Sequence, residues 1–311
     1  MKLGTILTAL FVAAFAVGLL TGDDTLVRML LINGAAQLVL FTVVAAIPFL
    51  RTGRMSYVDI AWPFGVALIG VLVLVLGDGA LPRRLAVGAV YLFIGLRMGL
   101  AALVLGRTTG MIFRHEFPRY QFRRMVLERS GTSHVRAHAL AEVMTQGLGN
   151  ASVLALPGLL MAVDARTSVS VWEAAGLALW AAAYIFESTA DLQKMRFVTR
   201  NRGGLCDVGL WRYSRHPNYF GQWLVWTGLV IAAVPSWWAL RDATPTAVWI
   251  GLGIGAAGAS AMLYLTLVYL TGAVPAEHFS VQKRPGYAAY QATTNRFFPW
   301  FPKPQPDTSP S

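Results

Sequence analysis

The chain has 311 residues, of which 56% are hydrophobic and only 13% are charged. A soluble domain of this size does not need so much apolar surface, and the composition therefore favours a membrane protein with several spans. The net charge of +11 is typical of some nucleic-acid-binding proteins. Here, however, the basic residues are concentrated in alternate loops, so we expect no nucleic-acid partner.

Eight apolar stretches reach or approach the roughly 20 residues that a helix needs to cross a bilayer. In chain order they are residues 3–20, 26–50, 59–76, 85–105, 139–163, 171–190, 219–234 and 246–270. The first follows Lys2 as in a signal peptide, but it lacks a clear small-residue cleavage site, so we interpret it as a helix. We expect an all-α, polytopic bundle of about eight transmembrane helices. It would form one domain over residues 1–303, with a Pro/Ser-rich disordered tail over 304–311.

Positive charge follows an alternating pattern along the chain. Lys and Arg are concentrated in the loops 106–138 and 191–216 and in the tail after residue 270, whereas the other connections carry mostly aspartates. The positive-inside rule then places both termini and the large basic segments in the cytoplasm. We therefore expect an integral protein of a bacterial inner membrane.

Three features do not indicate a function. Residues 253–258, GIGAAG, match a dinucleotide fingerprint, but they lie within an expected span with no preceding strand, so their predicted role is close helix packing. His134, His138 and Glu142 share a helical face, yet histidines that lead into a span are more often interfacial, and we expect no metal site. Cys206 is the only cysteine, which excludes an internal disulfide.

A dense polar cluster precedes one apolar stretch, in residues 211–223, WRYSRHPNYFGQW. Pro217 suits the first position of a helix, and the backbone N–H groups after it lie at the positive end of the helix dipole. Such a helix start favours phosphate, and Arg215 would add a full charge. Asn218 and Gln222 would present two amides on one helical face.

The preceding apolar stretch ends in a second cluster, in residues 186–197, FESTADLQKMRF. Glu187, Asp191 and Lys194 follow the i, i+4, i+7 spacing of one helical face. A solvated, salt-bridged helix end would account for Lys194 but less well for Glu187, which lies near the end of an apolar run. Adenine, ribose hydroxyls and pyrophosphate require such a mixture of amides, carboxylates and arginines, so the two clusters predict a nucleotide site.

These clusters belong to a wider pattern. Together with SYVDIAW (56–62), GLRMGLAALVLGR (95–107), HEFPRYQFRRM (115–125) and the segment at 284–303, RPGYAAYQATTNRFFPWFPK, the chain resembles the DUF1295 group of the steroid 5α-reductase superfamily over residues 35–303. The resemblance implies a membrane enzyme that binds NADPH between its helices from the cytosolic side. It would reduce a carbon–carbon double bond in a lipophilic enone, such as a steroid-like or isoprenoid lipid, that enters from the surrounding membrane lipids. No obligatory protein partner is implied.

The resemblance also implies which residues contact the cofactor. They are Arg97, Arg107, Glu187, Asp191, Lys194, Tyr213, Ser214, Arg215, His216, Asn218, Tyr219, Gln222, Tyr287 and Tyr290. Either Arg97 or Arg107 would hold the 2′-phosphate, and the two C-terminal tyrosines would close the pocket.

The chain departs from the family pattern at two positions. Gln222 stands where a glutamate is usual, and Ile94 stands where a tyrosine would polarise the substrate carbonyl. The catalytic candidates are therefore Asp59, Tyr57 and Tyr91. Asp59 in an apolar span can stay protonated and donate a hydrogen bond to the carbonyl oxygen, or it can simply cap its helix.

Two other functions fit parts of the sequence. A membrane methyltransferase of the isoprenylcysteine or phospholipid type would use a similar Arg-His-Pro turn for S-adenosylmethionine, but it usually carries paired glutamates where this chain has Glu277 followed by His278. A non-enzymatic lipid-binding or transport protein is the third reading. Transporters often show repeats and broken helices at the midplane, whereas here the polar residues gather at helix ends.

Overall fold

The computed structural model describes residues 2–304, and within that range the chain is helical with no β-strand. The all-α prediction is confirmed. The expected disordered tail, apart from residue 304, lies outside the described residues.

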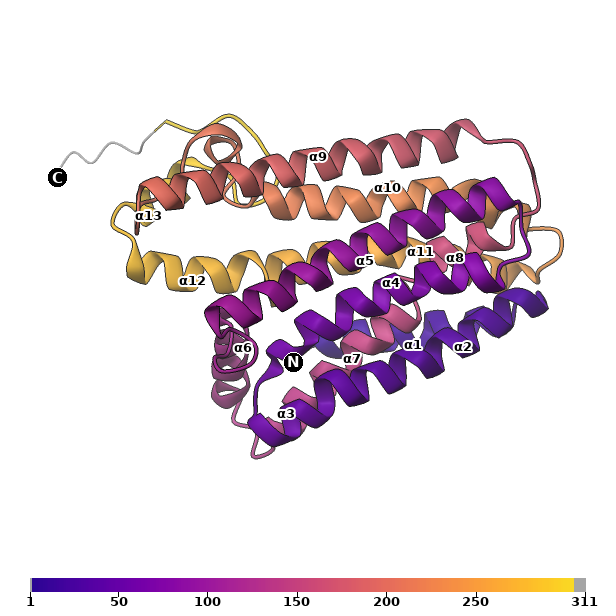
Figure 1. Cartoon of the computed structure of the whole chain (residues 1–311), viewed down its shortest axis with the longest axis horizontal. Coiled ribbons are helices and arrows are strands. Elements are labelled where there is room, and N and C mark those ends of the chain that lie inside the picture. Colours follow the sequence, from indigo (N-terminus) through magenta and orange to yellow (C-terminus); the bar gives the residue numbers. More distant parts are fainter. Residues whose placement is uncertain (1, 305–311) are drawn as a thin grey trace.

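The α-helices form one elongated bundle (Figure 1). They are α1 (Lys2–Gly18), α2 (Asp24–Phe41), α3 (Ile47–Thr52), α4 (Val58–Leu76), α5 (Leu81–Thr109), α6 (Pro118–Arg129), α7 (Val135–Ala151), α8 (Leu156–Ala162), α9 (Val171–Arg200), α10 (Pro217–Ala239), α11 (Thr246–Leu265), α12 (Ala273–Lys283) and α13 (Tyr287–Thr293). Short π-helical segments, η1 (Thr42–Ala46) and η4 (Thr266–Leu270), join α2 to α3 and extend α11.

Five helical segments in the described range are long and apolar enough to cross a membrane. They are Asp24–Thr52, Met55–Leu76, Leu81–Thr109, Val135–Ala162 and Thr246–Lys283, and the apolar helix Leu3–Gly18 is shorter. The protein is thus an integral membrane helix bundle. The two other expected spans lie in α9 and α10, which are not among the five; the second half of α9 carries the charged cluster of residues 187–196.

Helices α9 and α10 pack side by side along their length (Figure 1). Small residues permit this approach, because a Cβ atom on Gly221 would lie 2.9 Å from the Cα of Glu187, and one on Gly176 would lie 2.3 Å from the backbone N of Ala232. The close contact at Gly221 brings the two polar clusters predicted from the sequence together.

Residues 253–258 lie inside α11, as the sequence predicts. A Cβ atom on Gly255 would lie 2.7 Å from a methyl group of Leu156, and one on Gly251 would lie 2.8 Å from Val17. The glycines therefore serve helix packing, and no strand precedes them in the described chain.

The start of α4 is fixed by a residue distant in sequence. Glu116 accepts hydrogen bonds from the backbone N–H groups of Met55 (2.7 Å) and Ser56 (3.0 Å), and the Ser56 hydroxyl accepts one from the N–H of Phe117 (2.9 Å). Pro118 then begins α6 at the N1 position. This anchoring holds the first turn of α6 against the first turn of α4.

Candidate active site

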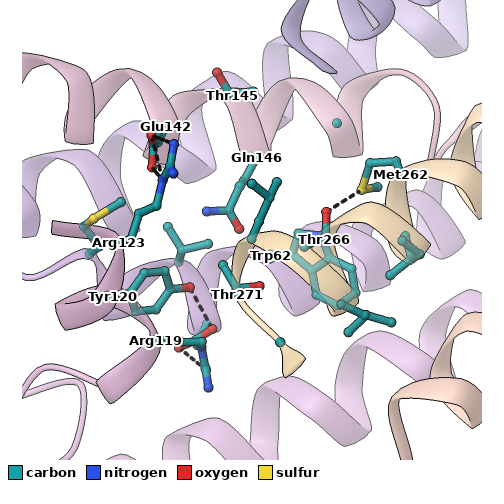
Figure 2. A pocket seen from close by; sticks show the side chains of 18 of the residues that line it. Trp62, Arg119, Tyr120, Arg123, Glu142, Thr145, Gln146, Met262, Thr266 and Thr271 are labelled. Carbon is teal, nitrogen blue, oxygen red and sulfur yellow. Dashed lines mark hydrogen bonds and ion pairs between the residues drawn. The ribbon is translucent and has the colours of Figure 1, made fainter. Parts of the chain in front are cut away.

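A cavity of about 690 Å³ lies between the helices at the end of the bundle near α6 (Figure 2). Residues of α1, α4, α5, α6, α7, α9, α10 and α11 line it. Its apolar lining includes Leu7, Phe11, Trp62, Met98, Met262, Leu263 and Leu267. The volume falls within the roughly 300–1,000 Å³ that small-molecule and cofactor sites occupy.

A cluster of three polar residues faces this cavity. Arg119 donates to one oxygen of Asp59 (Nη2–Oδ2 2.6 Å), and the Tyr120 hydroxyl donates to the other (Oη–Oδ1 3.1 Å) (Figure 2). Both oxygens of Asp59 thus accept hydrogen bonds in this structure, one from a guanidinium and one from a phenol. Asp59 makes no capping hydrogen bond at the start of α4.

Tyr120 was not among the predicted catalytic residues. Burial, and next the charge of Asp59, raise the pKa of Tyr120 well above its usual value, so the phenol stays neutral and keeps its proton for donation. A signal for this role was present in the sequence, since HEFPRYQFRRM belongs to the resemblance, but nothing local in that segment connects it to Asp59. The contact depends on the Glu116 anchor described above.

The predicted cofactor residues of α9 and α10 meet at another part of the same cavity. Arg97 of α5 pairs with Glu187 (3.0 Å) and lies 3.9 Å from Asp191, and the Asn218 amide donates to Asp191 (Nδ2–Oδ1 3.0 Å). The Asn218 side-chain oxygen is shut off from solvent and has no hydrogen-bond partner in the described chain. A buried acceptor without a partner is costly, and this oxygen could be satisfied by an N–H or O–H group of a ligand.

Gln222 and Tyr219 of α10 line the cavity beside Asn218. Gln222 is nearly buried and its amide lies 3.9 Å from the sulfur of Met98, a weak contact. The ring of Tyr219 stacks on His216 with 5.1 Å between centroids. Tyr219 and Asn218 line both the large cavity and a smaller hollow behind it, so the two spaces share a wall.

The smaller hollow, of about 60 Å³, is basic. Lys194 and Arg284 line it, and no carboxylate does. The Lys194 ammonium lies 3.8 Å from the centre of the Trp211 ring and makes no ion pair within the described chain, and Arg284 contacts only the Ser280 hydroxyl (3.4 Å). One buried water needs about 10–15 Å³, so this space suits roughly four water-sized groups, about the size of a phosphate.

Burial and the facing Arg284 shift the protonation of Lys194. They lower its pKa to about 8, because an ammonium is poorly solvated there and is repelled by the guanidinium. Burial also lowers the pKa of His216, so the imidazole at the edge of the hollow is neutral at physiological pH. A bound phosphate would relieve the repulsion between the two cations.

Three predicted cofactor residues hold the C-terminal segment instead. Arg215 is buried, pairs with Glu277 (2.8 Å) and donates to the backbone carbonyls of Gln291 (2.9 Å) and Thr294. Ser214 donates to the carbonyl of Phe297 (2.9 Å). Arg215 also lines the small hollow, but its charge is paired with Glu277 and it fixes the C-terminal segment.

The third of these residues, Tyr213, accepts a backbone hydrogen bond from Trp300 (2.9 Å) and lies outside both spaces. The two C-terminal tyrosines line the small hollow. The Tyr290 hydroxyl donates to the carbonyl of Trp211, and burial raises the pKa of Tyr287 to about 12. Both tyrosines thus lie beside the predicted cofactor residues of α9.

Three other predicted residues lie away from the cavity. The Tyr91 hydroxyl is fully buried, donates to the carbonyl of Leu154 (2.6 Å) and accepts from the N–H of Gly158 (3.2 Å). Tyr57 accepts from Arg54 (3.1 Å). Arg107 lines a separate surface hollow at the end of α5. None of the three lines the cavity.

Three other positions named in the sequence analysis, Ile94, His138 and Glu142, make local contacts. Ile94, which occupies the usual tyrosine position, is buried in the core. Glu142 accepts from Arg123 (2.8 Å), and His138 contacts the backbone oxygen of His134 (3.0 Å), so these side chains do not converge on a common point. No group of metal-ligating residues occurs in the described range.

Gln146 is a polar residue that the sequence analysis did not single out. It projects from α7 into the cavity (Figure 2) and makes no hydrogen bond within the described chain. A free amide in a mostly apolar space offers one donor and one acceptor to a polar group of a bound molecule.

The fold defines an integral membrane helix bundle, and the cavity between its helices has the size of a small-molecule site. The chain matches the model of the family DUF1295, described as proteins of unknown function, over residues 47–294, and it belongs to that family. No curated protein and no solved structure matches it.

Proposed function

We propose that the protein is an NADPH-dependent reductase of a carbon–carbon double bond in a lipophilic enone. The observation that carries this proposal is that one cavity joins the Asp59–Arg119–Tyr120 cluster to the amide and carboxylate group of α9 and α10. The Asp59–Arg119–Tyr120 cluster can polarise a carbonyl, and the amides and carboxylates of α9 and α10 suit a nucleotide.

The residues present fit NADPH. Asp191 and Glu187 are acceptors for ribose hydroxyls, and the unpaired oxygen of Asn218 is an acceptor for an N–H or O–H group. The basic hollow formed by Lys194 and Arg284 supplies two cations for a phosphate, on the other side of the Asn218 wall. Arg97 is already neutralised by two carboxylates, so it is less suited to the 2′-phosphate than this pair.

NADPH supplies a hydride for the β-carbon of the enone. The protein's task is to stabilise the negative charge that develops on the carbonyl oxygen, and Tyr120 is the donor placed to do so. Arg119 and Tyr120 both donate to Asp59, which holds the Tyr120 hydroxyl at the cavity until its proton turns to the carbonyl oxygen of the substrate. The apolar walls exclude water from the reacting carbon atoms. A proton taken up from the solvent then adds to the α-carbon of the enolate and balances the hydride.

The proposed enzyme spans a bacterial inner membrane with eight helices, including α1, α9 and α10, and with both termini and the cofactor site facing the cytoplasm. In support, α6, α12 and α13 gather at the end of the bundle where α1 begins (Figure 1), and the basic loops are at this end. The substrate enters from the surrounding lipids, which fits a cavity walled by membrane helices.

Titration of the purified protein with NADPH, NADH and S-adenosylmethionine tests the proposal. We expect NADPH to bind and to quench tryptophan fluorescence. Binding of S-adenosylmethionine without NADPH would identify a methyltransferase, and binding of neither would favour a lipid-binding or transport protein. Lipid analysis of cells with and without the protein would then reveal the substrate as a pair of lipids that differ by two hydrogens.

A further inference from the structure

A second basic hollow, separate from the cavity, lies where α5 ends. Its volume is about 420 Å³, and it is lined by Gly106, Arg107, Thr108, Thr109, Gly110, Phe113, Arg114 and His115. Arg107 and Arg114 are exposed and neither makes an ion pair or side-chain hydrogen bond within the described chain, and no carboxylate lines the hollow. Two guanidinium groups therefore face the same space with no counter-charge.

Hydrogen bonds from Arg54 and within the turn itself fix the turn that forms this hollow. Arg54 donates to the backbone carbonyls of Ile112 (3.1 Å) and Phe113 (2.6 Å), and the N–H of Ile112 donates to the carbonyl of His115 (2.9 Å). Ile112 is buried and adopts a φ of 72°, a conformation that β-branched residues rarely tolerate. A turn secured in this way presents Arg114 on a preformed surface.

The position of the hollow relates it to the bilayer. Helix α5 is one of the five segments apolar enough to cross a membrane, and it ends at Thr109, inside the hollow. Leu100 and Val104 are 54% and 62% exposed, and they share one helical face with Arg107 through the i, i+4, i+7 spacing. An apolar strip thus leads directly to the two arginines.

We infer that this hollow binds the headgroup of an anionic phospholipid, with an acyl chain lying along Leu100 and Val104. The cations lie where a span ends, which is the depth of phosphate groups, and basic residues next to spans attract anionic lipids. A free phosphate would use the arginines but not the apolar strip. The site does not depend on the reductase activity.

Lipid retention measures this site directly. The full-length protein is purified in mild detergent, incubated with equal amounts of phosphatidylglycerol and phosphatidylcholine, and examined by native mass spectrometry. One basic residue near an anionic surface contributes roughly 1 kcal/mol, or about fivefold in affinity. We therefore expect the double variant Arg107→Gln, Arg114→Gln to bind phosphatidylglycerol about 25-fold more weakly, and each single variant about fivefold.

A control variant with the same net charge distinguishes binding in the hollow from general attraction between a basic protein and an anionic lipid. Arg129 and Arg202 are exposed, line neither cavity nor hollow, and their replacement by glutamine removes the same charge. The inference predicts that this control retains phosphatidylglycerol like the wild type, and that the uncharged replacement Val104→Gln reduces retention with both arginines in place. Three results would overturn the inference. They are an equal loss of phosphatidylglycerol binding in the two double variants, equal retention of phosphatidylglycerol and phosphatidylcholine by the wild type, and complete displacement of phosphatidylglycerol by inorganic phosphate.

Discussion

Tyr120 donates a hydrogen bond to Asp59 with 3.1 Å between Oη and Oδ1, across 61 positions of sequence, while Arg119 holds the other carboxylate oxygen at 2.6 Å. This relationship changes which residue is expected to act on the substrate. The phenol has a single proton, which it gives to Asp59 in this structure and must turn to the carbonyl oxygen when substrate binds.

The first prediction follows from this geometry. Tyr120→Phe removes the donor but keeps the ring, so hydride transfer should slow by about a hundredfold or more, the usual effect of losing one such donor in a dry site. NADPH affinity should change little. Single-turnover oxidation of NADPH measures the rate. Tyr57→Phe is the matched control, because Tyr57 does not line the cavity, and its rate should equal that of the wild type.

Asp59→Asn tests the orienting residue. The amide cannot neutralise Arg119, and it can offer its N–H where Tyr120 now finds an acceptor, so we expect slower hydride transfer with nearly normal NADPH binding. Full turnover in Asp59→Asn would remove Asp59 from the mechanism and leave Tyr120 to act alone.

The third prediction concerns the α9–α10 group. Asn218→Ala and Asp191→Ala should each weaken NADPH binding by about 1–3 kcal/mol, the range for lost hydrogen bonds that involve charged or buried groups. Isothermal titration in detergent measures this change. Thr189→Ala serves as the control, because Thr189 is exposed and its hydroxyl donates a hydrogen bond only to the carbonyl of Ile185 in the same helix, α9. Wild-type affinity in both test variants would mean that the cluster only stabilises the helix ends.

The fourth prediction is a pH dependence that originates at Lys194. Its pKa of about 8 means that the ammonium is charged below pH 8 and neutral above it. If it contacts a phosphate of NADPH, affinity should fall as the pH rises from 7 to 9.5, by roughly tenfold for one charge-assisted hydrogen bond. Lys194→Arg should abolish this fall, because a guanidinium stays charged, and Lys194→Met should bind weakly at every pH.

The other groups that face Lys194 do not produce this dependence. Burial lowers the pKa of His216 and raises those of Cys206 and Tyr290, so all three are neutral near pH 8, and the pKa of Tyr287 is about 12. The charge of Asp191 acts on Lys194 in the opposite direction to burial, raising its pKa, and the value of about 8 already includes this effect. An equal fall in Lys194→Arg would locate the titrating group elsewhere.

The fifth prediction separates folding from cofactor binding at Arg215. Arg215→Gln leaves Glu277 buried without its main partner and frees two backbone carbonyls, so it should destabilise the protein by about 3–5 kcal/mol. Arg215→Lys should not restore stability, because an ammonium cannot reproduce the forked contacts. Thermal unfolding in detergent measures both. Arg296→Gln is the control: Arg296 also contacts Glu277, but it is 41% exposed, and its loss should cost little.

The membrane class and the position of most helices were predictable from the sequence because each apolar stretch is a local property. A segment that must satisfy its own backbone hydrogen bonds in lipid forms a helix whatever its neighbours do. The meeting of Glu187, Asp191 and Asn218 could also be anticipated, since α9 and α10 are adjacent in the chain and Gly221 permits their contact. The count of spans was less predictable, because α9 combines an apolar half with a charged half.

Only the tertiary structure decided which polar residues share the cavity. The sequence favoured Tyr57 and Tyr91 over Tyr120, whereas in the structure Tyr91 donates to the Leu154 carbonyl and Tyr120 reaches Asp59 because Glu116 anchors α6 on α4. The partner of Arg215 was likewise not predictable, because it is Glu277, 62 positions later in the chain. Local patterns determine helices, but the pairing of a charge with its partner depends on long-range packing, which no short segment encodes.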